Sequence, residues 1–157
     1  MKPLQMPEIW KKRRTIESLC CKIPLFGWFF VALCENDRFC RARSEISEQL
    51  VVRKRCCQCI SDFQSREYGV DLAIAQQAGA AIMSIHGWPN SCFCRNDPLQ
   101  LLIFDDDLNR EIFDAIAKVF DCESESLLQY YDKNPGLTFG DLIGTIRRCI
   151  IIPAPAC

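Results

Sequence analysis

Apolar residues recur at helical spacing along the second half of the chain. From Arg66 onward they fall three or four positions apart, which is the period of one face of an α-helix. Gly87 supplies a helix stop, and Pro89 prevents the helix from resuming. The pattern therefore predicts a helix from residue 66 to Gly87, with an inner face formed by Val70, Ile74, Ala78, Ala81, Ile82 and Ile85.

Three further helices are predicted toward the C-terminus. The first spans residues 108–120 with Asp107 as its cap, and a short one spans 124–131. Thr138 is suited to cap a last helix over 139–149, because its hydroxyl can accept a bond from a first-turn amide. Burial of one stripe is expected to hold these helices together, and this stripe consists of Ile112, Ile116, Val119, Leu142 and Ile146.

The connections between these helices carry turn signals. Residues 88–99 are predicted to form a loop, and Asn134-Pro135-Gly136 a turn, because glycine and proline favour turn conformations over helix. The pattern of the apolar segment 99–104 (LQLLIF) is compatible both with a strand and with a loop packed over a helical core.

The first half of the chain is less regular. Residues 8–21 are predicted to be helical, and an apolar run occupies 23–34. The charged stretch 35–45 is predicted to be a loop. Ser47 is a suitable N-cap for a helix over 48–63, since its hydroxyl can accept a first-turn amide.

These elements predict a mainly α fold class, a small helical bundle with an N-terminal helical extension. Its predicted parts are a basic and apolar extension at 1–65, the bundle at 66–150 and a tail at 151–157. The run Arg53-Lys54-Arg55 lies in the extension, and we interpret it as a solvated helix face.

Charge is divided unevenly along the chain. The net charge of -1 arises from twelve basic and six acidic residues over 1–59, against seven basic and fourteen acidic residues over 60–157. A basic arm of this kind can lie on its own acidic domain, or meet anionic lipid or nucleic acid. We favour the first alternative, and nucleic acid is not favoured as a partner.

The apolar run raises the question of a membrane. Four cations, residues 11–14, precede it, as in a signal peptide, but its 12 residues are short of the roughly 20 that span a bilayer. We favour a buried or interfacial segment. A membrane-surface anchor formed by residues 11–34, and a signal segment, are the alternatives.

Twelve cysteines are present, several as adjacent or near neighbours. A chain of this length does not need disulfide staples, so we interpret most of them as reduced thiols in a reducing, cytoplasmic compartment. Cys56, Cys59, Cys92 and Cys94 offer four soft ligands for zinc. However, Cys-x-Cys replaces the second Cys-x-x-Cys of a zinc ribbon, so inert thiols are favoured. His86 is interpreted as a helix-end residue rather than a general base.

The order of these helices, with four local motifs, resembles acyl and peptidyl carrier proteins over about residues 66–150. Asp105-Asp106-Asp107-Leu108 stands where a carrier has Asp-Ser-Leu, and Glu111 stands where those helices often carry a glutamate. Val119-Phe120-Asp121 resembles the end of the same helix. The segment 137–142 (LTFGDL) resembles the threonine-capped start of the last one. The chain is also similar to uncharacterised bacterial carrier-like proteins that lack the serine.

The departure from the carrier pattern determines the expected function. Asp106 takes the position of the serine, and a carboxylate has no hydroxyl with which to form the phosphopantetheine diester. The resemblance therefore implies no prosthetic group, no enzymatic activity and no cofactor. It implies a protein-interaction module that docks an unidentified protein partner through Asp105, Asp106, Asp107 and Glu111. These carboxylates are not predicted to bind a metal, because the spaced ligands and central glycine of a calcium loop are absent. A membrane-associated protein using 11–34 and a cysteine-based zinc protein are the alternatives.

Overall fold

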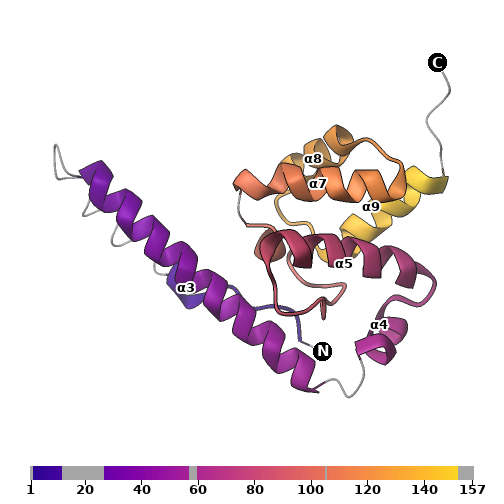
Figure 1. The fold of residues 1–157 in the computed structure, drawn as a ribbon, viewed down its shortest axis with the longest axis horizontal. Helices are drawn as coiled ribbons and strands as arrows, with labels where there is room; N and C mark the ends of the chain where they lie inside the picture. The colour runs from indigo at the N-terminus through magenta and orange to yellow at the C-terminus, as the bar shows by residue number, and fades with distance from the viewer. Residues whose placement is uncertain (1, 12–26, 57–59, 105, 152–157) are drawn as a thin grey trace. The chain divides into compact units, whose positions relative to one another are not determined.

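The computed structural model describes residues 2–11, 27–56, 60–104 and 106–151. These residues are mainly helical, which confirms the predicted fold class, and no strand is found among them. The chain divides into two compact units: residues 5–49 form one, and residues 1–4 with 50–157 form the other. The helices are α1 (Glu8–Lys11), α3 (Gly27–Cys56), α4 (Ile60–Tyr68), α5 (Leu72–His86), α6 (Leu99–Leu102), α7 (Asp106–Phe120), α8 (Ser124–Lys133) and α9 (Phe139–Ile151), with a 3₁₀ turn at Gly69–Asp71 (Figure 1).

The long helix α3 corrects two predictions. The charged stretch 35–45 is helical rather than a loop, and Ser47 lies inside the helix rather than at its N-cap. The stretch contains no glycine or proline, and an ion pair of 2.9 Å joins Asp37 to Arg41 four residues later, a spacing that stabilises helices. The helix predicted over 48–63 is divided between two helices. Its first part belongs to α3, which ends at Cys56, and its last part belongs to α4, which begins at Ile60.

A segment before α1 binds along α3 within the unit 5–49. The amide N–H of Gln5 donates to Oε1 of Gln49 at 2.8 Å, and Nε2 of Gln49 donates back to the Gln5 carbonyl at 3.1 Å. The N–H of Glu8 donates to Oε2 of Glu45 at 2.9 Å. The side chains of α3 therefore satisfy backbone groups of the segment. Helix α1 covers the start of the helix predicted over 8–21, of which residues 12–21 lie outside the described residues.

The helix predicted from residue 66 to Gly87 is interrupted near its start. Gly69 has a positive φ of 54°, which a helix cannot contain, and α5 begins only at Leu72. Val70 falls in this interruption and is 87% exposed, so its predicted place on the inner face is wrong. The C-terminal end is confirmed: α5 stops at His86, and Gly87 adopts the left-handed conformation (φ 68°) that caps it.

Helices α7, α8 and α9 complete the bundle around α5. Helix α7 packs against both α5 and α8, and α9 packs against α5 (Figure 1). The buried face of α7 consists of Ile112, Phe113, Ile116 and Ala117. Val119 is 52% exposed, so its place in the predicted stripe is wrong: it lies at the end of α7, beyond the buried residues of this helix. The other predicted members of the stripe are buried, as are the neighbouring residues Phe139 and Ile143.

Backbone hydrogen bonds fasten the loop before α6 to the start of α9. The carbonyl of Asp97 accepts from the N–H of Phe139 at 2.8 Å, and the carbonyl of Arg95 accepts from Gly140 at 2.8 Å. The N–H of Leu99 donates to the Leu137 carbonyl, also at 2.8 Å. The segment 99–104, predicted to be either a strand or a loop, begins with a short helix, α6, whose residues Leu99, Leu101 and Leu102 are buried.

Candidate functional site

The outer surface of α7 and α8 carries a dense group of carboxylates. Between residues 105 and 133 the sequence has nine acidic and three basic residues. We use the name acidic face for its exposed described members, which are Glu111, Asp114, Asp121, Glu123, Glu125 and Asp132. Of the predicted partner-binding residues, Glu111 is exposed on α7. Asp105 lies outside the described residues, and so do the side chains of Asp106 and Asp107, which are the first residues of α7.

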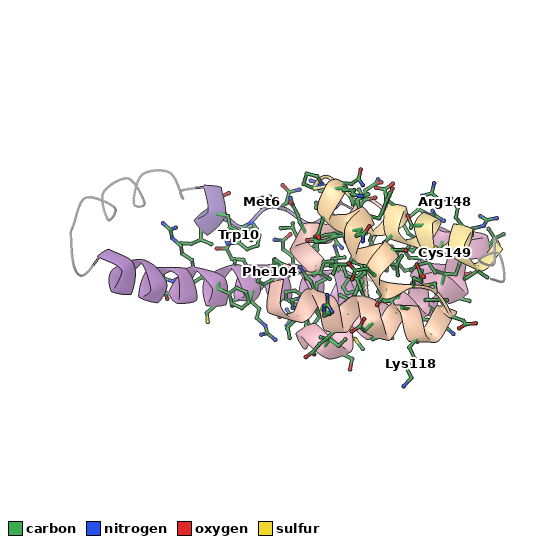
Figure 2. The ribbon with its side chains drawn as sticks, turned by 90° about the horizontal axis from the view of Figure 1, so that it is seen from above. Met6, Trp10, Phe104, Lys118, Arg148 and Cys149 are labelled. Carbon is green, nitrogen blue, oxygen red and sulfur yellow. The ribbon has the colours of Figure 1, made fainter. Side chains whose placement is uncertain are left out.

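The amphipathic pattern of α7 positions these carboxylates. Glu111 and Asp114 are one turn apart, on the side opposite the buried Ile112 and Ile116. Lys118 continues this outer side and extends away from the ribbon in Figure 2. Because the core packing fixes the rotation of the helix, the same apolar side chains that hold the bundle direct the carboxylates to solvent.

The turn between α7 and α8 brings the acidic residues of both helices together. The N–H of Cys122 donates to the Ala117 carbonyl at 3.0 Å, and Asp121 adopts a positive φ of 50°, which reverses the chain. Phe113 and Tyr131 then pack with ring centroids 5.6 Å apart. Asp114 of α7 and Glu125 of α8 line the same depression, so carboxylates of both helices share part of one surface.

A shallow depression lies between the two helices. Its cavity volume is about 10 Å³, far below the roughly 300 Å³ at which ligand pockets usually begin. One ion pair, Arg110 with Glu125 at 3.7 Å, crosses its rim, and both side chains are largely exposed. The geometry suits contact with a macromolecular surface better than enclosure of a small molecule. The lining residues are Arg110, Phe113, Asp114, Ser124, Glu125 and Leu128.

A second polar cluster is buried and was not predicted. Arg53 donates to both carboxylate oxygens of Asp97, at 2.6 and 2.8 Å, and to the carbonyls of Lys2 and Cys92 at 2.7 and 3.2 Å. Asp97 also accepts the N–H groups of Leu4 and Cys94 at 2.8 and 2.7 Å. The interpretation of residues 53–55 as a solvated face is therefore wrong for Arg53 and holds for the exposed Lys54 and Arg55.

This cluster joins distant parts of one unit rather than offering a reactive group. Both carboxylate oxygens of Asp97 are occupied by donors, and the residue is 0% exposed. Buried charges in proteins are usually paired in this way, because an unpaired one is costly. No local signal in the sequence marks Arg53, since its partner lies 44 positions away.

The cysteines that were considered as zinc ligands are only partly described. Cys92 and Cys94 are buried, and burial raises the pKa of the Cys94 thiol to about 12. Zinc binds the thiolate, and burial in the absence of a metal disfavours that form. Cys59 and the side chain of Cys56 lie outside the described residues. Among the side chains that are described, no group of three or more His, Cys, Asp or Glu residues is arranged to hold a metal ion.

The single histidine is enclosed by aromatic rings. His86, the last residue of α5, is buried, and its ring stacks with those of Trp88 and Phe104 at centroid distances of 5.5 and 5.6 Å. Its predicted position at a helix end is confirmed. The ring packs in the interior, so it also contributes to the core.

No helix within the described ranges is long and apolar enough to cross a membrane. Of the proposed anchor segment 11–34, residues 12–26 lie outside those ranges. No family model matches the chain, and no curated protein or solved structure matches it. The resemblance to carrier proteins therefore rests on the sequence motifs alone.

Proposed function

We propose that this protein is a non-catalytic interaction module that docks a basic surface of a protein partner through the acidic face of α7 and α8. The observation that carries the proposal is the group of six exposed carboxylates on these two helices and on the turn between them, near Asp105, Asp106 and Asp107 in sequence. Complementary charge accelerates association and selects partners. The small volume of the depression between the helices supports a surface contact rather than a small-molecule site.

The absence of chemistry is part of the proposal. In the carrier-like interpretation Asp106 replaces the attachment serine, so no phosphopantetheine arm is expected. A cytoplasmic location belongs to the same proposal, because most of the cysteines are interpreted as reduced thiols. Intact mass after co-expression with a broad-specificity phosphopantetheinyl transferase tests this part. We expect no added mass, and an addition the size of phosphopantetheine would contradict it.

Charge reversal tests the docking face. Glu111→Lys with Asp114→Lys removes two carboxylates from the face, while Glu48→Lys with Asp62→Lys makes the same charge change at exposed positions elsewhere. Proteins captured from the native cell lysate by the immobilised full chain would be compared among wild type and the two variants. We expect at least one stoichiometric partner to be lost with the first pair and kept with the second.

Salt provides an independent readout of the same contact. Because the proposed interaction is electrostatic and lies at the surface, it should weaken as ionic strength rises. The proposal would be contradicted if no stoichiometric partner is lost on reversal of Glu111 and Asp114, or if capture of the lost partner is insensitive to salt. Reversal of Asp105 and Asp106 extends the test to the start of α7.

A further inference from the structure

Residues 2–4 bind to a part of the chain from which a whole compact unit separates them in sequence. They group with residues 50–157, although residues 5–49, which form the other unit, lie between. No part of 50–157 leads directly into this segment. Its attachment to that unit therefore depends on the contacts it makes there, as the attachment of a bound peptide does.

The ion pair of Arg53 and Asp97 binds backbone groups of the segment on both sides of Pro3. The N–H of Leu4 donates to Oδ1 of Asp97 at 2.8 Å, and the guanidinium of Arg53 donates to the carbonyl of Lys2 at 2.7 Å. Pro3 has no N–H that needs an acceptor, and it favours an extended conformation of the residue before it. The ion pair thus offers an extended segment the donor and the acceptor that a neighbouring strand would offer.

One side chain of the segment is enclosed. Leu4 is 3% exposed, whereas Lys2 and Pro3 are exposed. Sites that bind peptides in an extended form combine main-chain hydrogen bonds, which give affinity, with side-chain pockets, which give specificity. The arrangement therefore fits an extended segment that has a leucine two residues after its bound carbonyl.

The binding groups are positioned by contacts that do not involve the segment. Arg53 donates to both carboxylate oxygens of Asp97, at 2.6 and 2.8 Å, and to the Cys92 carbonyl at 3.2 Å. The N–H of Cys94 donates to Asp97 at 2.7 Å, and the Asp97 carbonyl accepts from Phe139 at 2.8 Å. A site whose donors and acceptors are held in this way loses less entropy when it binds a peptide.

We propose that Arg53, Asp97 and the position of Leu4 form a peptide-binding site, which the chain's own residues 2–4 occupy and which the same segment of a second copy of the chain occupies by exchange. An identical segment makes the same two backbone bonds and presents the same leucine, so exchange needs no new complementarity. A linked segment has an effective concentration of roughly millimolar. Exchange therefore requires a comparable local concentration or a weakened segment in the receiving copy. The inference is independent of the acidic face, which does not include these residues.

A peptide added to the full chain tests the site. Leu4→Glu should release the chain's own segment, because an unpaired charge is costly to bury. A fluorescent, N-acetylated peptide of residues 1–6 (MKPLQM) is titrated into this variant, the wild type and Lys2→Ala, which replaces an exposed side chain and keeps the backbone carbonyl. We expect saturable binding to Leu4→Glu. Binding to the other two proteins should be at least about tenfold weaker, because their own segment competes.

Two altered peptides test how the site recognises the segment. N-methylation of the leucine removes the N–H that Asp97 accepts and keeps the side chain, so it should weaken binding at least about tenfold. Replacement of the leucine by glutamate should do the same. Circular dichroism verifies folding, and Leu4→Ala is the milder variant if Leu4→Glu unfolds. The proposal is overturned if the folded variant does not bind the peptide, or binds the N-methylated peptide equally well.

Exchange between copies is measured by photocrosslinking. A photoreactive amino acid replaces the exposed Pro3 in the full chain, and isotopically light and heavy copies are mixed at concentrations up to roughly millimolar. We expect covalent dimers whose light–heavy crosslinks join position 3 to residues near Asp97, and Leu4→Glu in the photoreactive copy should abolish them. Crosslinks only within single copies at the highest concentration, or dimers that persist with Leu4→Glu, would overturn the exchange.

Discussion

Replacing Arg53 with methionine is expected to destabilise the protein by about 3 kcal/mol. Removing one partner of a buried ion pair typically costs about 3–5 kcal/mol, because the other charge stays buried without compensation. Asp97 is 0% exposed, but it keeps two backbone donors, the N–H groups of Leu4 and Cys94. These donors still stabilise the carboxylate, which places the expected loss at the lower end of the range. The carbonyls of Lys2 and Cys92 also lose their donor.

A double-mutant cycle separates this pair from general damage to the fold. Urea unfolding followed by circular dichroism would be measured for Arg53→Met, Asp97→Asn and the double variant at neutral pH. We expect the two losses to be non-additive by at least about 1.5 kcal/mol. Lys54→Met, at the exposed neighbouring position, should change stability by less than about 0.5 kcal/mol. A loss below about 1 kcal/mol for Arg53→Met, or additive losses, would refute the reasoning.

Three further predictions concern α9 and the residue before it. Gly140→Ala should destabilise the protein by about 1–2 kcal/mol, since a Cβ there would lie 3.0 Å from the Arg95 carbonyl oxygen. The Cβ of Gly144→Ala meets nothing within 4 Å, so this change should stabilise the helix by about 0.5–1 kcal/mol. Chemical unfolding of both variants compares the two effects directly. Thr138→Ala should cost about 1 kcal/mol, because Thr138 and Asp141 bond reciprocally at the helix start. The hydrogen bonds from Thr138 lower the pKa of Asp141, so its stabilising contribution is complete above the carboxyl's unfolded pKa and is lost as pH falls through the lower folded one. Asp141→Asn should therefore reduce the acid dependence of unfolding, and unchanged dependence would be inconsistent with that bond.

Local signals in the sequence predicted the helix ends that depend on a single residue type. Gly87 stops α5 because glycine adopts a positive φ without strain, and Thr138 starts α9 because its hydroxyl reaches a first-turn amide. The amphipathic spacing predicted most of the buried face of α7 and α9. It failed at Val70, where Gly69 interrupts the helix and changes the rotation of the residues after it.

The contacts that span long sequence separations could not be predicted. The basic run 53–55 looks uniformly solvated, and only the fold brings Asp97 to Arg53. The charged stretch 35–45 was wrongly predicted for a different reason: polar residues without glycine or proline are compatible with an exposed helix as well as a loop. The acidic face itself is visible in the sequence as an excess of carboxylates after residue 104.

Site-specific photocrosslinking in the cells that express the protein tests the central proposal most directly. A photoreactive amino acid would replace Glu111 on the acidic face or, as the control, the exposed Gln77 on α5. Our account predicts a discrete protein adduct from position 111 that is absent from position 77. The partner protein in this adduct should be crosslinked at a basic region of its surface. Adducts of equal yield from both positions, or none from position 111, would contradict docking through α7 and α8.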